Sequence, residues 1–254
     1  MKLDNLLSTI QKVALDNKIS QPFIVGGIPR DRVIGKSNIS TIRDIDITTG
    51  NNDSSSLAKI LHKVLPDSNY RVYDDGHSSI NIRGLHIDFS SHFIAPGVED
   101  ELKRKNIKDI DSMKLEIYSR DFTINTLLET LDFTNIYDIT GESIKDIEAK
   151  IIRCPVNPEI TISVDPRRIL RAIKFSIKYG FEIDDSLKAA IKNNREKIRN
   201  LPVKFVQDKA NEIALLDDKK GIDSLIEYKV LPLIPLTKTL SDLLTQQRRL
   251  MRAL

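Results

Sequence analysis

The sequence predicts an α+β fold, in which a mixed sheet with helices is followed by an almost all-helical second half. Apolar residues recur with a period of 3.6 in residues 3–14, which is typical of an amphipathic helix. Residues 42–48 instead alternate between polar and apolar side chains, which is the period of a β-strand. Helical periodicity dominates from about residue 116 onward. We therefore predict a mixed domain over residues 1–140 and a helical domain over residues 141–254.

Strands and helices alternate along the first part of the chain. Further short strands are predicted at residues 22–25, 70–73, 78–82 and 85–89. Short helices are predicted from about Pro29 and after the serine run 54–56, because proline suits a first helical turn and serine suits an N-cap. Residues 94–114 are densely charged and lack sustained apolar periodicity, so they predict a mobile or partly helical excursion. The later helices are predicted at 116–131, 143–149, 165–179, 184–194, 202–216 and 219–229.

The composition excludes several classes of protein. The chain has 254 residues, a formal net charge of +3, 40% hydrophobic residues and 30% charged residues, which is typical of a globular protein with a core. Its one cysteine, Cys154, excludes an internal disulfide and a multi-cysteine metal site. The apolar runs are too short to span a bilayer, and the charged first helix is unlike a signal peptide. We expect no membrane association and a reducing, cytoplasmic compartment.

Charge is distributed unevenly along the chain. Residues 1–164 carry 20 Lys plus Arg against 24 Asp plus Glu, whereas residues 165–254 carry 19 against 12. The basic second part is suited to a polyanion such as RNA. A solvated Lys/Arg face on helices is the alternative interpretation.

Two carboxylates on the predicted strand 42–48 form the first candidate site. Asp44 and Asp46 are two residues apart, so their side chains leave the strand on one face, with Cα atoms about 6.5–7 Å apart. Mg²⁺ prefers carboxylate oxygens combined with substrate phosphates, and such ions stabilise the attacking and leaving oxygens of phosphoryl transfer. The alternative is an exposed strand edge without a ligand.

The turn Gly26-Gly27, between a predicted strand and a predicted helix, is the second candidate site. Glycine lets backbone N–H groups approach a phosphate, and the helix N-terminus adds favourable partial charge. Arg30, in the helix that follows, carries a planar donor fork that suits a triphosphate. The spacing matches neither a Walker A loop nor a GxGxxG motif, and an ordinary tight turn is the alternative.

The third candidate site is the segment from Arg120 to Asn125. Asp121 and Asn125 are four residues apart, so they share one face of the predicted helix 116–131. A carboxylate and an amide placed there can bond ribose hydroxyls while Arg120 meets a phosphate. The alternative is a capped helix with polar groups facing solvent.

The fourth candidate site begins at Asp165, which with Pro166 predicts a helix start. Asp165, Arg168 and Arg171 are each three residues apart, so they follow one helix face. A carboxylate held beside a guanidinium can present acceptors and donors to a nucleobase edge. An i,i+3 ion pair on a capped helix is the alternative.

In this order and spacing, the four motifs resemble those of the class II nucleotidyltransferases, the family of bacterial-type tRNA CCA-adding enzymes and poly(A) polymerases. The resemblance extends from about Phe23 to Leu231 and depends on the segments FIVGGIPRDRVIG, RDIDITT, SRDFTINTL and DPRRILRAIKFSIKYGF. It implies a polymerase-β-like nucleotidyltransferase head in residues 1–140 and a helical neck and partial body in 141–254. The implied reaction is template-independent addition of CMP or AMP to the 3′ end of tRNA, with release of pyrophosphate.

The resemblance also implies a role for each motif. Asp44 and Asp46 match the catalytic carboxylates that bind metal, so Mg²⁺ is the implied cofactor. Binding of the nucleotide, ATP or CTP, is implied for the other matched residues: Gly26, Gly27, Arg30, Arg120, Asp121, Asn125, Asp165, Arg168 and Arg171. Among these, Asp165 and Arg168 match the pair that selects the base, and Arg171 matches a phosphate contact. The excursion at 94–114 falls where the family has a flexible loop that assists switching between nucleotides.

Departures from the family pattern leave alternatives open. Val164 stands where the family has Glu, and Ser119 stands where it has Arg. Relatives continue through longer regions that hold tRNA, whereas here little but a basic stretch at 246–252 follows Leu231. The alternatives are a poly(A) polymerase, an enzyme that adds only C or only A, an enzyme that nucleotidylates another target, and a non-catalytic RNA-binding module. Asp88, in the predicted strand 85–89, is a candidate third carboxylate.

Overall fold

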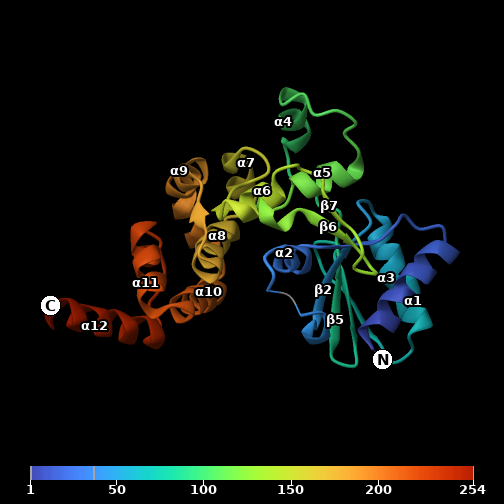
Figure 1. Ribbon diagram of the computed structural model, residues 1–254. Helices are drawn as coiled ribbons and strands as arrows, with labels where there is room; N and C mark the ends of the chain where they lie inside the picture. The colour runs from blue at the N-terminus through green and yellow to red at the C-terminus, as the bar shows by residue number, and fades with distance from the viewer. Residues whose placement is uncertain (1, 37, 254) are drawn as a thin grey trace. The chain divides into compact units, whose positions relative to one another are not determined.

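The computed structural model describes residues 2–36 and 38–253, without the side chains of Asp218 and of residues 247–253, and forms two compact units, Met1–Ile147 and Glu148–Leu254 (Figure 1). Most of the basic stretch at 246–252 therefore lies outside the described side chains.

The boundary between the units falls after Ile147 because helix α6 (Ser143–Glu148) is bonded into the first unit. The Thr123 hydroxyl donates to Asp146 at 2.7 Å, and the Ser143 and Thr126 hydroxyls lie 2.6 Å apart.

The first unit is built on a seven-stranded mixed sheet. Its strands are β1 (Phe23–Val25), β2 (Asp44–Thr48), β3 (Asn69–Val72), β4 (Ser78–Ile82), β5 (Leu85–Phe89), β6 (Leu127–Thr130) and β7 (Ile136–Asp138), in the spatial order β3-β4-β5-β2-β1-β6-β7. The β2–β5 pair is parallel and the other pairs are antiparallel. Strand β2 therefore lies at the centre of the sheet, bonded to a neighbour on each side.

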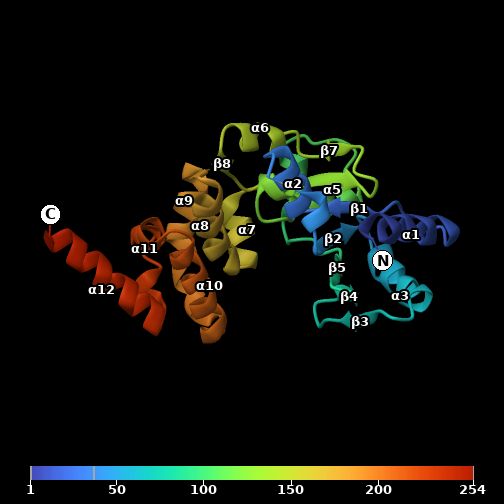
Figure 2. The same cartoon turned by 60° about the horizontal axis from the view of Figure 1, so that its bottom comes forward.

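Two helices cover one face of this sheet, α1 (Leu3–Asp16) and α3 (Asp53–Val64), which lie side by side in both views (Figures 1 and 2). Their buried leucines and isoleucines form one core cluster with Ile45 and Ile47 of β2 and with Ile87 and Phe89 of β5. Besides α6, the shorter helices of the unit are α2 (Gly27–Val33), α4 (Val98–Arg104) and α5 (Ser112–Tyr118), with 3-10 turns at Ile39–Thr41 and Thr123–Asn125. Helix α5 packs on the other face, where Ile117 meets Val25 and Leu128.

The helix predicted over residues 116–131 is wrong. Helix α5 ends at Tyr118, Phe122 is extended with φ −135° and ψ 149°, and the chain then enters β6. Strand β6 is bonded to β1 on one side and to β7 on the other, and this pairing outweighs the helical spacing of its apolar residues. The excursion at 94–114 is partly helical, as predicted, because it contains α4.

The second unit consists of helices and one short ladder. Its helices are α7 (Pro158–Val164), α8 (Arg167–Tyr179), α9 (Asp185–Asn194), α10 (Val203–Leu216), α11 (Asp218–Glu227) and α12 (Lys238–Ala253), with 3-10 turns at Arg195–Asn200 and Leu231–Leu233. Figure 2 shows α8 beside α10. The unit also contains a short parallel pair of strands, β8 (Ile151–Ile152) with β9 (Glu182–Ile183). Among the described residues, no helix of the chain is both long and apolar enough to cross a bilayer.

Candidate active site

The side chains of β2 alternate between the two faces of the sheet. Ile45 and Ile47 are buried beneath α1 and α3, whereas Asp44 and Asp46 are exposed on the opposite face. The parallel register places Asp46 directly beside Asp88 of β5, so the same face carries three carboxylates on two adjacent strands. Asp88 is engaged by its own strand, because His86 Nε2 lies 3.1 Å from its Oδ1.

The Gly26 turn lies against the second of these carboxylates. Strand β1 pairs Val25 with Asp46, so the chain turns at Gly26 beside the Asp46 side chain. Gly26 has φ 81° and ψ −119°, a conformation that essentially only glycine adopts. A Cβ at this position would lie 3.0 Å from Asp46 Oδ2. Glycine is thus required here both by the backbone and by the closeness of the carboxylate.

The donor set fits a magnesium ion. Mg²⁺ is commonly bound through one or two carboxylates, with substrate phosphates and water completing its octahedron. Asp44 and Asp46 supply two exposed carboxylates on one strand face, and the Gly26-Gly27 turn leaves backbone beside them for a phosphate group. In the described part of the chain, no three His, Cys, Asp or Glu side chains are grouped to hold an ion by themselves.

Arg30 lies beneath the glycine turn. Only 5% of the residue is exposed, and its Nε donates to Asp31 Oδ1 at 2.8 Å. A Cβ at Gly27 would lie 3.3 Å from its Nη2, so the second glycine makes room for the guanidinium. Its Nη1 donates to the side-chain oxygen of Asn125, 95 residues away in the sequence. Contact between Arg30 and a triphosphate stays a prediction.

Asp121 and Asn125 are brought together, but by a turn and not by the helix that the sequence predicted. The Asn125 Nδ2 donates to Asp121 Oδ1 at 2.9 Å, and the same oxygen accepts the Phe122 backbone N–H at 2.9 Å. Asp121, Asn125 and Arg30 are all buried. Because Asn125 bonds both Asp121 and Arg30, a continuous chain of hydrogen bonds joins the glycine turn to the third motif.

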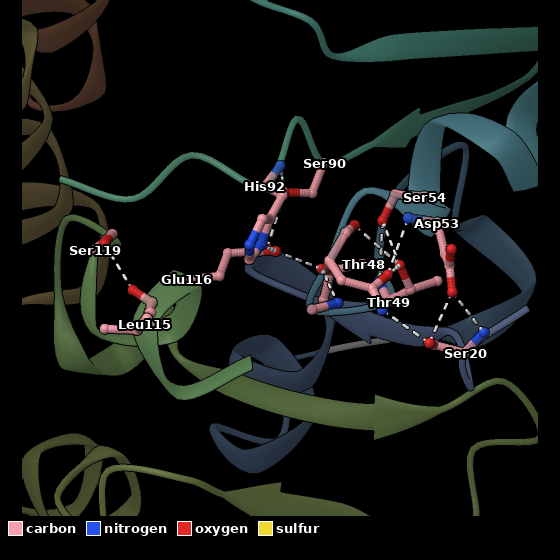
Figure 3. A network of polar contacts seen from close by, with 12 residues as sticks. Ser20, Thr48, Thr49, Asp53, Ser54, Ser90, His92, Leu115, Glu116 and Ser119 are labelled. Carbon is pink, nitrogen blue, oxygen red and sulfur yellow. Dashed lines mark hydrogen bonds and ion pairs between the residues drawn. The ribbon is translucent and has the colours of Figure 1, made fainter. Parts of the chain in front are cut away.

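Sequence reasoning missed the buried carboxylate that contacts Arg120. Arg120 Nη2 donates to Glu116 Oε1 at 3.2 Å, an i,i+4 pair. Figure 3 shows Glu116 bonded to Thr48, Ser90 and His92 as well, at the ends of β2 and β5. The signal in the sequence was the opposite charge four residues before Arg120.

Ser119, where the sequence departs from the pattern of the family that it resembles, makes two hydrogen bonds within the first unit. Its hydroxyl donates to Leu115 O at 2.6 Å (Figure 3) and accepts the Ala95 N–H at 2.9 Å, which joins the end of α5 to the segment after β5.

A second cluster in Figure 3 joins the end of β2 to α3. Asp53 accepts the backbone N–H of Ser20 at 3.0 Å and its hydroxyl at 2.7 Å, and these bonds lower the pKa of the Asp53 carboxyl. The Ser54 hydroxyl accepts the Thr49 N–H at 3.0 Å, which occupies a serine that was expected to cap the helix.

The fourth motif belongs to the second unit. Asp165 precedes α8 and accepts the backbone N–H of Arg167 at 3.0 Å and its Nε at 2.7 Å. Arg168 Nη1 donates to Thr161 O at 3.4 Å, and the Arg171 guanidinium lies 5.3 Å from the centre of the Phe175 ring. Asp165 is extended, with φ −143° and ψ 95°, and precedes α8, so the prediction that it shares a helix face with Arg168 and Arg171 is wrong. The role of the three residues in selecting the base stays a prediction.

Comparison with known proteins identifies the family of the chain. A family model described as the poly A polymerase head domain matches residues 22–153, which contain β1, β2 and three of the motifs. The chain belongs to this family. The poly A polymerase head family is one of nucleotidyltransferases that in general depend on a metal ion, and the predicted polymerase-β-like head is confirmed.

The relatives are tRNA nucleotidyltransferases and CCA-adding enzymes by name. The chain is 29% identical over 182 residues to the A-adding tRNA nucleotidyltransferase of Geobacter sulfurreducens, covering 67% of this chain and 19% of that protein. It is 25% identical over 227 residues to the CCA-adding enzyme of Lacticaseibacillus paracasei, covering 89% and 54%. A CCA-adding enzyme solved with ATP superposes with a TM-score of 0.65 at 25% identity, covering 92% and 54%. The chain thus spans about half or less of the length of these proteins.

Proposed function

We propose that this protein adds CMP, AMP or both to the 3′ end of a tRNA without a nucleic-acid template and releases pyrophosphate. The observation that supports it most is the exposed pair Asp44 and Asp46 with Gly26 held against Asp46, in a chain of the poly A polymerase head family. The names of its relatives favour ATP and CTP as substrates and tRNA as acceptor.

Asp44 and Asp46 would hold Mg²⁺, which when bound activates the attacking 3′-hydroxyl and stabilises the leaving oxygens. The backbone N–H groups of Gly26 and Gly27 are suited to triphosphate oxygens. Arg30 would support this turn from beneath, through its bond to Asn125.

The remaining residues would orient the nucleotide. Arg120 would bind phosphate, and Asp121 with Asn125 would bond the ribose. In the second unit, Asp165 and Arg168 would select the base, and Arg171 would contact phosphate.

Incubation with tRNA that lacks its 3′-terminal nucleotides, labelled CTP or ATP, and Mg²⁺ tests this proposal. We expect label at the tRNA 3′ end with the wild type and none with Asp44→Ala. Absence of incorporation with every RNA tried, or equal incorporation by the variant, would refute it. Binding of RNA without transfer would instead support the non-catalytic module, and label on another macromolecule would support a different target.

Addition of A alone is a second candidate, because the A-adding relative is 29% identical to this chain. An acceptor tRNA that ends in CC distinguishes the two. An A-only enzyme extends this acceptor by one nucleotide and leaves a tRNA without CC unchanged, whereas a CCA-adding enzyme completes both. A product of many A residues would indicate a poly(A) polymerase.

A further inference from the structure

Glu116 is a buried carboxylate that has no role in the reaction proposed above. It lies on α5, with only 3% of the residue exposed. A buried carboxylate is tolerated when its oxygens accept hydrogen bonds or pair with a cation. The partners of Glu116 therefore show which parts of the structure its position serves.

Both oxygens of Glu116 are engaged by two groups each, and Figure 3 shows the contacts with Thr48, Ser90 and His92. Oε1 accepts the Ser90 hydroxyl at 2.8 Å and Arg120 Nη2 at 3.2 Å. Oε2 accepts the Thr48 hydroxyl at 2.9 Å and lies 3.3 Å from His92 Nδ1. An ionised carboxylate has about four acceptor positions, so the capacity of Glu116 is used fully.

These contacts join the two strands that carry the exposed carboxylates. Thr48 is two residues beyond Asp46, and both lie on the same face of β2. Ser90 is two residues beyond Asp88 and directly follows β5, where its N–H donates to Ile47 O at 2.9 Å. Glu116 thus lies at the ends of β2 and β5, and its hydrogen bonds to Thr48 and Ser90 hold the two strand ends together.

The remaining contact of Glu116 is with Arg120 of the third motif. Its Nη2 is held by Glu116, while its Nε is buried and has no hydrogen-bond partner among the described residues. The side chain is still 22% exposed. One edge of the guanidinium is therefore anchored, and the part of the side chain that is still exposed is what an incoming group can contact.

We propose that Glu116 is a positioning residue that orients Arg120 toward the nucleoside triphosphate and couples that orientation to the strand of Asp44 and Asp46. The inference rests on the proposed function, because it assumes that Arg120 contacts the nucleotide. Glu116 itself touches no substrate, and its effect on the nucleotide passes through Arg120.

A double-mutant cycle on binding of magnesium ATP and magnesium CTP tests this role. Glu116→Gln keeps the shape but removes the charge and part of the acceptor capacity, and Arg120→Ala removes the guanidinium. We expect each single change to weaken binding by about 10–100-fold, as for the loss of a hydrogen bond to a charged group. The nucleotide Kd of the double variant should be at most about twice that of the single variant that binds less tightly, because the two residues act as one unit.

Ser54→Ala is the matched control. It removes another buried hydroxyl, one of α3 that bonds Thr49 just beyond the end of β2 and, among the described residues, does not contact Arg120. We expect it to lower the melting temperature while leaving the nucleotide Kd unchanged. Where Glu116→Gln does not fold, Glu116→Asp replaces it, because the shorter side chain keeps the charge but cannot reach all four donors.

The possible results separate the two proposals. Multiplicative effects of the two changes, or an equal loss of binding in Ser54→Ala, would show a merely structural role for Glu116. Coupled binding without transfer to any RNA would support the positioning role and refute the proposed reaction. Failure of the wild type to bind either nucleotide would overturn both.

Discussion

Gly26→Ala is the substitution whose consequences the structure defines most sharply. The new methyl group would lie 3.0 Å from Asp46 Oδ2, so the carboxylate must move by a few tenths of an ångström. The φ of 81° adds strain of about 1–3 kcal/mol for a residue with a Cβ. We therefore expect a loss of about 1–3 kcal/mol in the free energy of unfolding and a fall in kcat/KM of about 10–100-fold, because small misplacements of reacting groups have effects of this order.

Gly35→Ala separates strain from displacement. Gly35 has a φ of 77°, and a Cβ there would meet no heavy atom within 4 Å. The assay is urea unfolding of both variants, together with steady-state incorporation of labelled nucleotide into tRNA. Both variants should lose stability, and only Gly26→Ala should lose activity. Equal activity losses, or full activity in Gly26→Ala, would refute the assignment of the glycine turn to the metal carboxylate.

Four further predictions follow from the same structure. Asp44→Asn should weaken Mg²⁺ binding, measured by calorimetry in the presence of ATP. The loss should exceed about 10–100-fold, which is typical when a residue that only supports a metal ligand is removed. Unchanged binding would place the metal elsewhere. Ile47→Ala, at a fully buried position of β2, should lower the free energy of unfolding by about 2–5 kcal/mol in urea titrations. Hydrogen bonds from Ser20 hold the pKa of Asp53 below 3.8. The charged carboxyl therefore stabilises the fold above pH 3.8, and this contribution is lost as the pH falls through the lowered pKa. Asp53→Asn should be less stable than the wild type at pH 7, with a difference that shrinks below pH 3.8. Arg168→Ala should change the ratio of CMP to AMP incorporated more than the total rate, and an unchanged ratio would contradict its role in base selection.

The sequence predicted the strand elements well where local pattern and burial agree. Ile45 and Ile47 alternate with Asp44 and Asp46, and the structure buries the first pair while exposing the second. Strands β4 and β5 have the predicted bounds, because each is a short apolar alternation ended by a turn. In these segments the alternation of apolar and polar residues matches the alternation of buried and exposed positions in the folded sheet.

Prediction failed where distant partners decide the structure. Leu127 and Leu128 fit a helical spacing, but β6 pairs with β1, which lies about a hundred residues earlier in the chain. The Arg30–Asn125 bond and the contacts of Glu116 with Thr48 and Ser90 likewise join distant segments. A single sequence carries the residues of such networks but not their pairing. Candidate site residues could therefore be proposed from the sequence, whereas the hydrogen bonds that join them could not be predicted.

A crystal of the protein with a non-hydrolysable ATP analogue and Mn²⁺ shows whether Asp44 and Asp46 bind the metal ion beside the nucleotide. Anomalous scattering locates Mn²⁺, which replaces Mg²⁺ at oxygen sites. We expect a manganese peak bound by the carboxylates of Asp44 and Asp46, with the triphosphate against the Gly26 turn. A peak elsewhere, or both carboxylates directed to solvent beside a bound nucleotide, would contradict it.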